Sequence, residues 1–268
     1  MKQKILLTGD DGYNSIGIRL LIHLLHDSYD LNIAATKVQQ SGVGGKINMK
    51  GGEIQEIIVD GVSGISVDGS PVDAIECANV YYKEKFDWVI SGMNLGVNIG
   101  GYNISSGTFS AAFYSLFSGL ATRVIAVSLD IDPSLHGYTH NGTDSLAKYI
   151  EYPGIPLSHL LPIIFSTPWY DAPLFNINFP YGDKYNRKVS ITSLRKKTEG
   201  YWTGPVVDLD NQRFYYPSLD HKAGDTDITI DAGAIAQGYV SVTPLFPYMI
   251  PDGQDRQKYI PKKKIFSL

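Results

Sequence analysis

Short apolar runs alternate with helical stripes along the first half of the chain. The run Ile5–Thr8 predicts a short buried strand, and apolar residues at positions 18, 21, 22 and 25 form the stripe of an amphipathic helix. Further strands are predicted near Leu31–Thr36, Phe86–Ile90 and Val124–Leu129. Strands that alternate with helices of about 10–15 residues are typical of parallel sheets covered on both faces. We therefore expect an α/β fold.

Glycine, proline and serine divide the remaining elements of this half. Residues Ser70–Asp73 are typical of a helix start, because Ser caps the helix, Pro fits its first turn and an acid follows. Ser41–Gly45 predicts a loop, and the stretch after it, to about Asp68, predicts short strands or hairpins. The Gly-rich segment Ser91–Gly107 predicts a long loop, and Thr108–Ser118 predicts a helix.

The chain changes character after about residue 150, where Pro and Tyr become dense. Tyr201–Asp227 has no helical period and predicts an extended arm or hairpins, and Val240–Pro244 predicts a late strand. We divide the chain into a core, residues 1–185, and a carboxy-terminal part, residues 186–268, with the arm, the late strand and an oligomerisation tail.

The predicted arm has large aromatic side chains but no core of its own. Exposed together, they would form an apolar patch beyond what monomers usually tolerate. A second subunit is the simplest cover, and two-fold symmetry would make the exchange of arms mutual. We expect a homodimer, or a tetramer made of dimers; the alternative is an arm that folds back on its own domain. The aromatic residues are Tyr201, Trp202, Phe214, Tyr215 and Tyr216.

Composition narrows the class of protein. Hydrophobic residues make up 43% and charged residues 19%, which is globular. A net charge of −4 argues against a nucleic-acid duplex as partner, and no apolar run is long enough for a membrane helix. The single Cys77 excludes an internal disulfide and a cysteine-cluster zinc site. The amino terminus lacks the apolar stretch of a signal peptide, so we expect a cytoplasmic protein without a membrane partner.

Three polar loops follow predicted strands, and they begin near Gly9, Gln40 and Ser91. Ligands of open α/β sheets bind beyond the carboxyl ends of the strands, so the three loops should open on the same edge. Asp10 and Asp11 are adjacent carboxylates that repel each other unless a cation or a proton intervenes.

Together with the Ser41 hydroxyl and the Asn94 amide oxygen, the two carboxylates would make an all-oxygen site for Mg²⁺ or Mn²⁺. The alternative interpretation is a solvated Asp-Asp-Gly turn. A second signal is Ser105–Thr108, which opens a predicted helix whose free N–H groups could bind phosphate. The alternative there is an ordinary Ser N-cap.

Other motif searches argue against several enzyme classes. The chain lacks a P-loop, a G-x-G-x-x-G after the first strand and a G-x-S-x-G nucleophile motif. Gly12 stands two residues after Asp10, where haloacid-type phosphatases place a second carboxylate. The six histidines form no metal-binding helix pair, and we interpret each as a surface residue. They are His23, His26, His136, His140, His159 and His221.

Several motifs, in order over nearly the whole chain, resemble the survival protein E (SurE) family. Each motif is weak alone, but together they are highly specific. They are Ile5–Tyr13 with Gly17-Ile18, Ser41-Gly42, Gly69–Asp73, Ser91–Gly100, Ser106–Thr108 with Ala111-Ala112, Asn176–Pro180, and Asp225–Asp227 through Gly238–Leu245.

The resemblance implies a metal-dependent phosphatase of nucleoside 5'-monophosphates with a Rossmann-like core and exchanged carboxy-terminal arms. It implies one divalent cation per subunit, and it implies catalytic roles for Asp10, Asp11 and Asn94. A phosphatase of another small or polyphosphate substrate, or a nucleotide-binding relative with little catalysis, are the alternatives. The implied metal ligands are Asp10, Asp11, Ser41 and Asn94, and the expected phosphate or substrate contacts are Ser41, Gly42, Asn98, Ser106, Gly107 and Thr108.

The chain departs from the family pattern at three places. Gly9 stands where the family usually has Asn, and Phe113-Tyr114 replaces a small and acidic stretch. Thr36–Gln40 lacks the usual Pro and Arg. The implied metal ligands are intact, so we expect the reaction to be kept.

Overall fold

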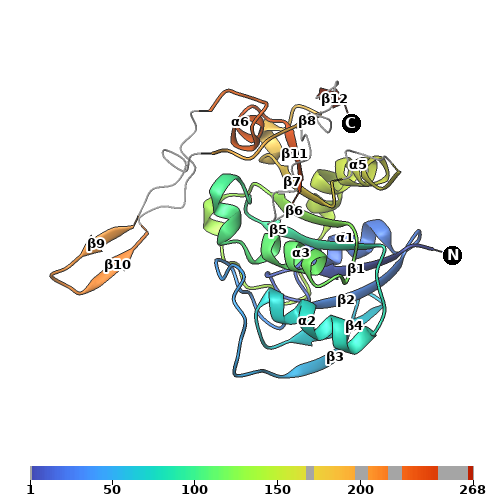
Figure 1. Cartoon of the computed structure of the whole chain (residues 1–268). Helices are drawn as coiled ribbons and strands as arrows, with labels where there is room; N and C mark the ends of the chain where they lie inside the picture. Colours follow the sequence, from blue (N-terminus) through green and yellow to red (C-terminus); the bar gives the residue numbers. More distant parts are fainter. Residues whose placement is uncertain (1, 167–171, 197–204, 217–224, 247–264, 268) are drawn as a thin grey trace, which may run out of the picture.

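A ten-stranded sheet forms the centre of the computed structural model, in the order β12-β8-β11-β7-β6-β5-β1-β2-β4-β3 (Figure 1). The structure describes residues 2–166, 172–196, 205–216, 225–246 and 265–267. The strands of this sheet are β1 (Lys4–Thr8), β2 (Asp30–Thr36), β3 (Ile54–Val59), β4 (Val62–Val67), β5 (Trp88–Leu95), β6 (Val124–Leu129), β7 (Leu174–Phe179), β8 (Lys188–Ile191), β11 (Val240–Leu245) and β12 (Ile265–Ser267). A separate hairpin consists of β9 (Val206–Asp208) and β10 (Arg213–Tyr215).

The helices connect these strands and cover the sheet. The α-helices are α1 (Ile16–Leu25), α2 (Pro71–Tyr82), α3 (Gly107–Phe117), α4 (Ala147–Tyr149), α5 (Ile155–Ser166) and α6 (Asp231–Ala236). Short helical turns are η1 (Gly100–Ile104), η2 (Pro133–Leu135), η3 (Ile150–Gly154) and η4 (Gly182–Lys184). No helix among the described residues is long and apolar enough to cross a membrane.

The six neighbouring strands from β7 to β4 run parallel to one another. Antiparallel strands flank them, because β3 pairs with β4 and β11 pairs with β7. This confirms the predicted Rossmann-like, mostly parallel sheet. The order also places β5, β1 and β2 side by side, so the loops that follow these strands open on one edge.

Alternate residues of a strand face opposite sides, and both faces of this sheet are covered. In β1, Ile5 and Leu7 pack in the cluster that contains α1 and α5, whereas Leu6 packs in the cluster that contains α2 and α3. All three side chains are fully buried. Burial of each such side chain contributes about 1.5–3 kcal/mol, which explains why so short a strand has a defined position in the sheet.

Several predicted boundaries agree closely with the structure. Ser70 caps α2, since its hydroxyl accepts from the Asp73 N–H at 3.1 Å and the Asp73 carboxylate accepts from the Ser70 N–H at 2.7 Å. The predicted hairpin region contains β3 and β4, and β6 spans the predicted range Val124–Leu129. The helix predicted from Thr108 begins one residue earlier.

The loop predicted over Ser91–Gly107 is wrong in its first part. β5 continues through Ser91 to Leu95, and after a register shift Asn94 pairs with Ser128 of β6. The glycines of this segment predicted a loop, but its buried position between β1 and β6 supplies ladder partners for its backbone. Helix α5 and strand β7 are not among the predicted elements.

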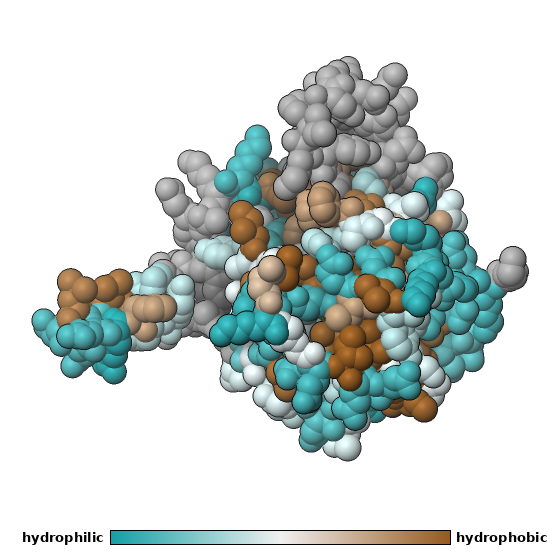
Figure 2. Space-filling model, turned by 60° about the horizontal axis from the view of Figure 1, so that its bottom comes forward, coloured by the Kyte–Doolittle hydropathy of each residue, from teal (hydrophilic) through white to brown (hydrophobic). Residues whose placement is uncertain are grey.

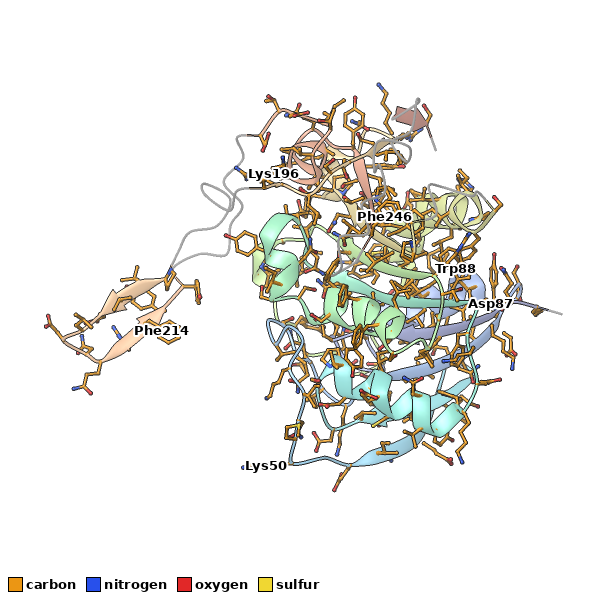
Figure 3. The ribbon with its side chains drawn as sticks, in the orientation of Figure 1. Lys50, Asp87, Trp88, Lys196, Phe214 and Phe246 are labelled. Carbon is orange, nitrogen blue, oxygen red and sulfur yellow. The ribbon has the colours of Figure 1, made fainter. Side chains whose placement is uncertain are left out.

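The carboxy-terminal part extends the sheet of the core, because β11 pairs with both β7 and β8. The predicted division at residue 185 therefore falls within one continuous sheet. The hairpin β9–β10 lies away from this sheet, with Lys196 at the root of the arm and Phe214 on the hairpin (Figures 1 and 3). This confirms a hairpin within Tyr201–Asp227, although Tyr201 and Trp202 lie outside the described residues.

Candidate active site

Two hydrogen bonds join the three polar segments at the carboxyl edge of the sheet. The Gln40 N–H donates to the backbone carbonyl of Asp10 at 2.6 Å, and the Leu95 N–H donates to Oδ2 of Asp11 at 3.0 Å. The loop after β1 is thus held between the loop after β2 and the end of β5. The expected convergence of the three segments is present.

Asp10 and Asp11 are buried, with exposed fractions of 3% and 7%. This excludes the alternative of a solvated turn. Burial raises the pKa of Asp10, while the Thr108 hydroxyl and nearby backbone N–H groups lower it. Burial, and then the charge of Asp10, raise the pKa of Asp11 to about 8. Two buried carboxylates with raised pKa values are the arrangement that a bound cation would stabilise.

The start of helix α3 faces Asp10. The Thr108 hydroxyl donates to Oδ1 of Asp10, and the backbone N–H groups of Thr108 and Gly107 also bond to this carboxylate. A Cβ on residue 107 would lie 2.7 Å from Oδ2 of Asp10, so only glycine allows this approach. The Ser106 hydroxyl caps the helix by accepting from the Phe109 N–H at 3.0 Å.

These bonds correct one expectation about the helix start. Its first N–H groups were expected to be free for phosphate, but Asp10 and the Ser106 hydroxyl already accept from them. The carboxyl group of Asp10 itself occupies the positive end of α3 in this structure. Ser106, Gly107 and Thr108 nevertheless lie beside the carboxylate pair, as the sequence placed them.

Asn94 and Ser41 lie on the two segments that bond to the Asp10–Asp11 loop, but in different surroundings. Asn94 is buried, and its amide nitrogen donates to the Gly96 carbonyl at 2.6 Å, which orients the side chain. Ser41 and Gly42 are exposed, and the Ser41 hydroxyl accepts from the Gln39 amide at 2.6 Å. The structure therefore connects Ser41 to the Asp10 loop through the backbone of Gln40.

Asn98 belongs to a buried network of polar side chains. Its amide nitrogen donates to the Ser128 hydroxyl at 3.0 Å, and its N–H donates to the Asn178 side chain at 2.8 Å. The Asn98 carbonyl accepts from the side chains of Asn176 and Asn178. Asn176 and Asn178 lie two positions apart in the otherwise apolar strand β7, so they face the same side of the sheet. This pattern is the sequence signal that could have indicated the network.

The segment between β6 and α4 contains two histidines whose surroundings the sequence did not indicate, and one of them lies beside Asn94. His140 is 8% exposed, and its Nδ1 lies 3.4 Å from the Ile16 N–H and 3.6 Å from Asp144, so its interpretation as a surface residue is wrong. Burial lowers the pKa of His140. The His136 ring lies 3.5 Å from the place of a Cβ on Gly96, beside the amide of Asn94.

The donors near the carboxylates fit a hard divalent cation. Among the described residues no group of three or more His, Cys, Asp or Glu side chains could hold a metal. A cation held by Asp10 and Asp11 would therefore need neutral oxygens as further ligands, and Asn94 and Ser41 carry such oxygens on the two segments that bond to the Asp10–Asp11 loop. Carboxylate, amide and hydroxyl oxygens are ligands that Mg²⁺ and Mn²⁺ prefer.

Comparison with known proteins agrees with this arrangement. Residues 5–201 match the profile of the family described as survival protein SurE. The chain belongs to the SurE family. It is 31% identical to the 5'-nucleotidase SurE of Archaeoglobus fulgidus and 30% identical to that of Methanococcoides burtonii, over 90–91% of this chain and 90–94% of those proteins.

A solved structure of a SurE protein has the same fold. The crystal structure of the SurE protein from Aquifex aeolicus superposes with a TM-score of 0.69 at 22% identity, covering 92% of this chain and 94% of that one. This similarity concerns the fold. It extends over the carboxy-terminal part as well as the core, so the SurE architecture is that of nearly the whole chain.

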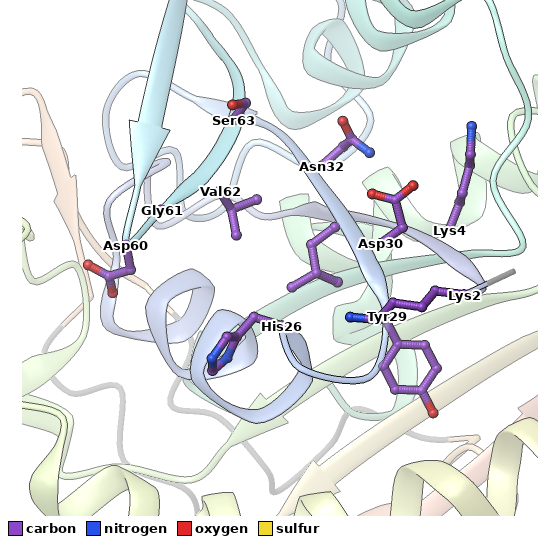
Figure 4. Close-up of a pocket in the computed structure, with 11 residues that line it drawn as sticks. Lys2, Lys4, His26, Tyr29, Asp30, Asn32, Asp60, Gly61, Val62 and Ser63 are labelled. Atoms are coloured by element: carbon purple, nitrogen blue, oxygen red, sulfur yellow. The ribbon is translucent and has the colours of Figure 1, made fainter.

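A groove of about 820 Å³ lies elsewhere on this SurE protein (Figure 4). It opens at the amino ends of β1, β2 and β4, where Lys4, Asp30 and Val62 line it. The carboxylate pair follows the opposite end of β1. Lys4 and Asp60 of the groove are paired with Glu84 and Arg19, so its charges are largely compensated. None of the candidate site residues lines it.

Proposed function

We propose that this protein hydrolyses nucleoside 5'-monophosphates to nucleoside and phosphate with one Mg²⁺ or Mn²⁺ per subunit. The observation that carries the proposal is the buried, adjacent pair Asp10 and Asp11 at the carboxyl edge of a parallel sheet. The relatives named 5'-nucleotidase SurE, matched along nine tenths of the chain, support the substrate class.

Asp10, Asp11, Asn94 and Ser41 would hold the cation through oxygen atoms. When bound, a divalent cation polarises a phosphoryl oxygen and lowers the pKa of water. The three hydrogen-bond donors of α3 orient Asp10, and the Leu95 N–H orients Asp11. These hydrogen-bond partners hold the carboxylates in place before any ligand binds. Partners that orient metal ligands in this way raise the affinity for the metal.

The two carboxylates are the candidates for taking the proton of the attacking water. Burial raises the pKa of both, which favours proton uptake, and the donors of α3 offset part of this effect at Asp10. We propose that one of the two acts as the proton acceptor.

The start of α3 is the proposed phosphate position. The positive end of its dipole attracts an anion beside Asp10, and Ser106, Gly107 and Thr108 lie there. Asn98 and Gly42 would border the substrate on the neighbouring segments. The asparagine partners of Asn98 hold it in position before substrate binds.

We also propose a cytoplasmic homodimer. The hairpin β9–β10 exposes apolar side chains away from the sheet, and Figure 2 shows them as one brown side of the hairpin. Phe214 is 68% exposed. A second subunit would bury this surface, in keeping with an exchanged arm. The single free Cys77 suits a reducing compartment.

The test is phosphate release from a substrate panel. The purified protein, stripped with EDTA, is assayed with added Mn²⁺ or Mg²⁺ on 5'- and 3'-nucleoside monophosphates, a sugar phosphate and polyphosphate. We expect metal-dependent release, fastest from 5'-monophosphates. Phosphate release from polyphosphate or the sugar phosphate alone would show that nucleoside 5'-monophosphates are not the substrates. No release from any compound with either metal would refute catalysis.

A further inference from the structure

A buried carboxylate outside the metal site joins three segments of the chain. Asp231, which is 0% exposed, accepts backbone N–H groups from Gly100 at 2.7 Å, Arg195 at 2.8 Å and Ala232 at 2.8 Å. Its Oδ2 atom bonds to Gly100, and its Oδ1 atom bonds to the other two. Both oxygens therefore act as acceptors of N–H groups.

The first of these segments belongs to the candidate active site. Gly100 begins η1, in the stretch 96–106 that connects Asn94 to the start of α3. The Gly100 carbonyl in turn accepts from the Asn103 amide at 2.9 Å, and Asn103 accepts from Asn176 at 3.3 Å. The stretch 96–106 is thus positioned from Gly100 on one side and from the asparagine network on the other.

The second segment is the root of the arm. Arg195 lies just before the chain leaves the sheet toward β9, and its side chain pairs at 3.6 Å with Asp225, which lies where the chain returns. Ser193 and Ile230 form a bridge between the outgoing and returning chains. The root of the arm is therefore closed by backbone pairing and by an ion pair, next to Asp231.

Segment 96–106 and the root of the arm approach each other closely at Gly100. Gly100 has a φ of +52°, and a Cβ there would lie 3.1 Å from the Arg195 carbonyl. Around it, Val97 and Ile99 of the site segment pack with Ala232 and Ile235 of α6. Segment 96–106 rests on the arm root and on α6 through this small cluster.

We propose that Asp231 is a positioning residue for the phosphate site, and that it ties the shape of segment 96–106 to the root of the arm. This deepens the proposed function and rests on it. An acceptor-only side chain is needed because all three partners are N–H donors. Loss of the Gly100 bond would free the segment that precedes α3, and small displacements of positioning groups cost catalysis heavily.

Asp231→Asn is the decisive substitution. Asparagine has nearly the same shape, and its oxygen can keep the bonds to Arg195 and Ala232, but its NH₂ group would face the Gly100 N–H. The control is Asp227→Asn, because within the described part of the chain the exposed Asp227 carboxylate bonds only locally, to the N–H and hydroxyl of Thr229. Both variants lose one negative charge on the same returning chain.

The measurements are kcat and KM for a nucleoside 5'-monophosphate with Mn²⁺, the Mn²⁺ affinity, the Tm and the oligomeric mass. For Asp231→Asn we expect KM to rise at least about tenfold, the range for loss of an orienting partner. Mn²⁺ affinity should stay within about twofold, with unchanged mass. Asp227→Asn should match the wild type. KM within about twofold of wild type in the folded Asp231→Asn protein would overturn the proposal.

A measurement on the wild-type chain keeps the test valid if the variant does not fold. Hydrogen exchange is followed with Mn²⁺, with and without inorganic phosphate. We expect amides of 96–106 and of the arm root, 192–196 and 225–232, to gain protection together. Protection confined to 96–106 would contradict the proposed coupling between this segment and the root of the arm. An inactive wild type that still shows joint protection would refute the proposed reaction and support the role of Asp231.

Discussion

The hydroxyl of Thr108 donates a hydrogen bond to the carboxylate of Asp10, which precedes it by 98 positions. The two residues meet because Gly107 allows the first turn of α3 to approach the loop after β1. One contact thereby joins a proposed metal ligand to the proposed phosphate site. It also explains why the phosphate-site residues and the carboxylate pair should act as one unit.

Thr108→Val tests this contact with little change in shape. Valine removes the hydroxyl, so Asp10 loses one orienting donor and its buried charge becomes less stabilised. We expect a loss of Mn²⁺ affinity or activity of roughly 10–100-fold. Calorimetric titration with Mn²⁺ and phosphate release measure the two effects. Thr108→Ser keeps the hydroxyl and should lose much less; equal losses in both variants would assign the effect to packing.

Asp11→Asn should abolish metal binding. It should also reduce activity by more than the roughly 10–100-fold that is lost when a residue hydrogen-bonded to a metal ligand is removed. The fold should remain, because the substitution removes repulsion between buried carboxylates. Metal titration, activity and circular dichroism provide the measurements. An Asp11→Asn protein with undiminished turnover would contradict the metal assignment.

The same carboxyl predicts how pH affects the metal-free protein. The folded state keeps the proton on Asp11 up to about pH 8, whereas the unfolded chain releases it near the usual value of 3.8. Between these values the folded state binds more protons, so the free energy of unfolding falls as pH rises. We expect the Tm to decrease across this window, and Asp11→Asn to flatten the decrease. A wild-type Tm that rises with pH, or an equal slope in the variant, would be the contrary result.

Gly9→Asn should tighten metal binding or raise activity. Gly9 does not have a positive φ, and a Cβ there would lie 3.6 Å from the Gly92 nitrogen, an ordinary contact. An amide side chain could therefore bond to a neighbouring loop and orient the carboxylates, an effect of about 10–100-fold in comparable sites. Gly9→Ala, which adds stiffness without an amide, is the matched control. A drop in both affinity and activity would show that glycine is required.

The exposed arm predicts a dimer in solution. Sedimentation at micromolar concentration should give at least twice the chain mass of 29.5 kDa. Replacing Phe214 and Tyr216 with Ser should weaken association at least about tenfold, because both side chains are exposed in the isolated subunit and would be covered in the dimer. Val80→Ser, at another exposed apolar position, on α2, should leave the mass unchanged. A stable wild-type monomer would favour an arm that folds back on its own subunit.

The sequence alone predicted the fold class, several strands and helices of the core, and the sheet edge at which the candidate site would lie. Period-two and helical patterns are local, so buried runs such as Ile5–Thr8 and Val124–Leu129 reveal their elements without knowledge of their neighbours. A polar loop after a parallel strand lies at a known edge of the sheet. The dipeptide Asp10-Asp11 could therefore be placed, and a cation at it could be proposed, before the fold was known.

The tertiary structure alone decided which groups complete the site. The donors to Asp10 come from α3, the bond that holds Gly100 comes from Asp231, and the burial of His140 comes from the start of α1. Each joins segments about 100 positions or more apart. No local pattern encodes such pairs, because they arise only when packing of the whole sheet brings their segments together. The strand character of Ser91–Leu95 has the same origin, since its ladder partners lie in β1 and β6.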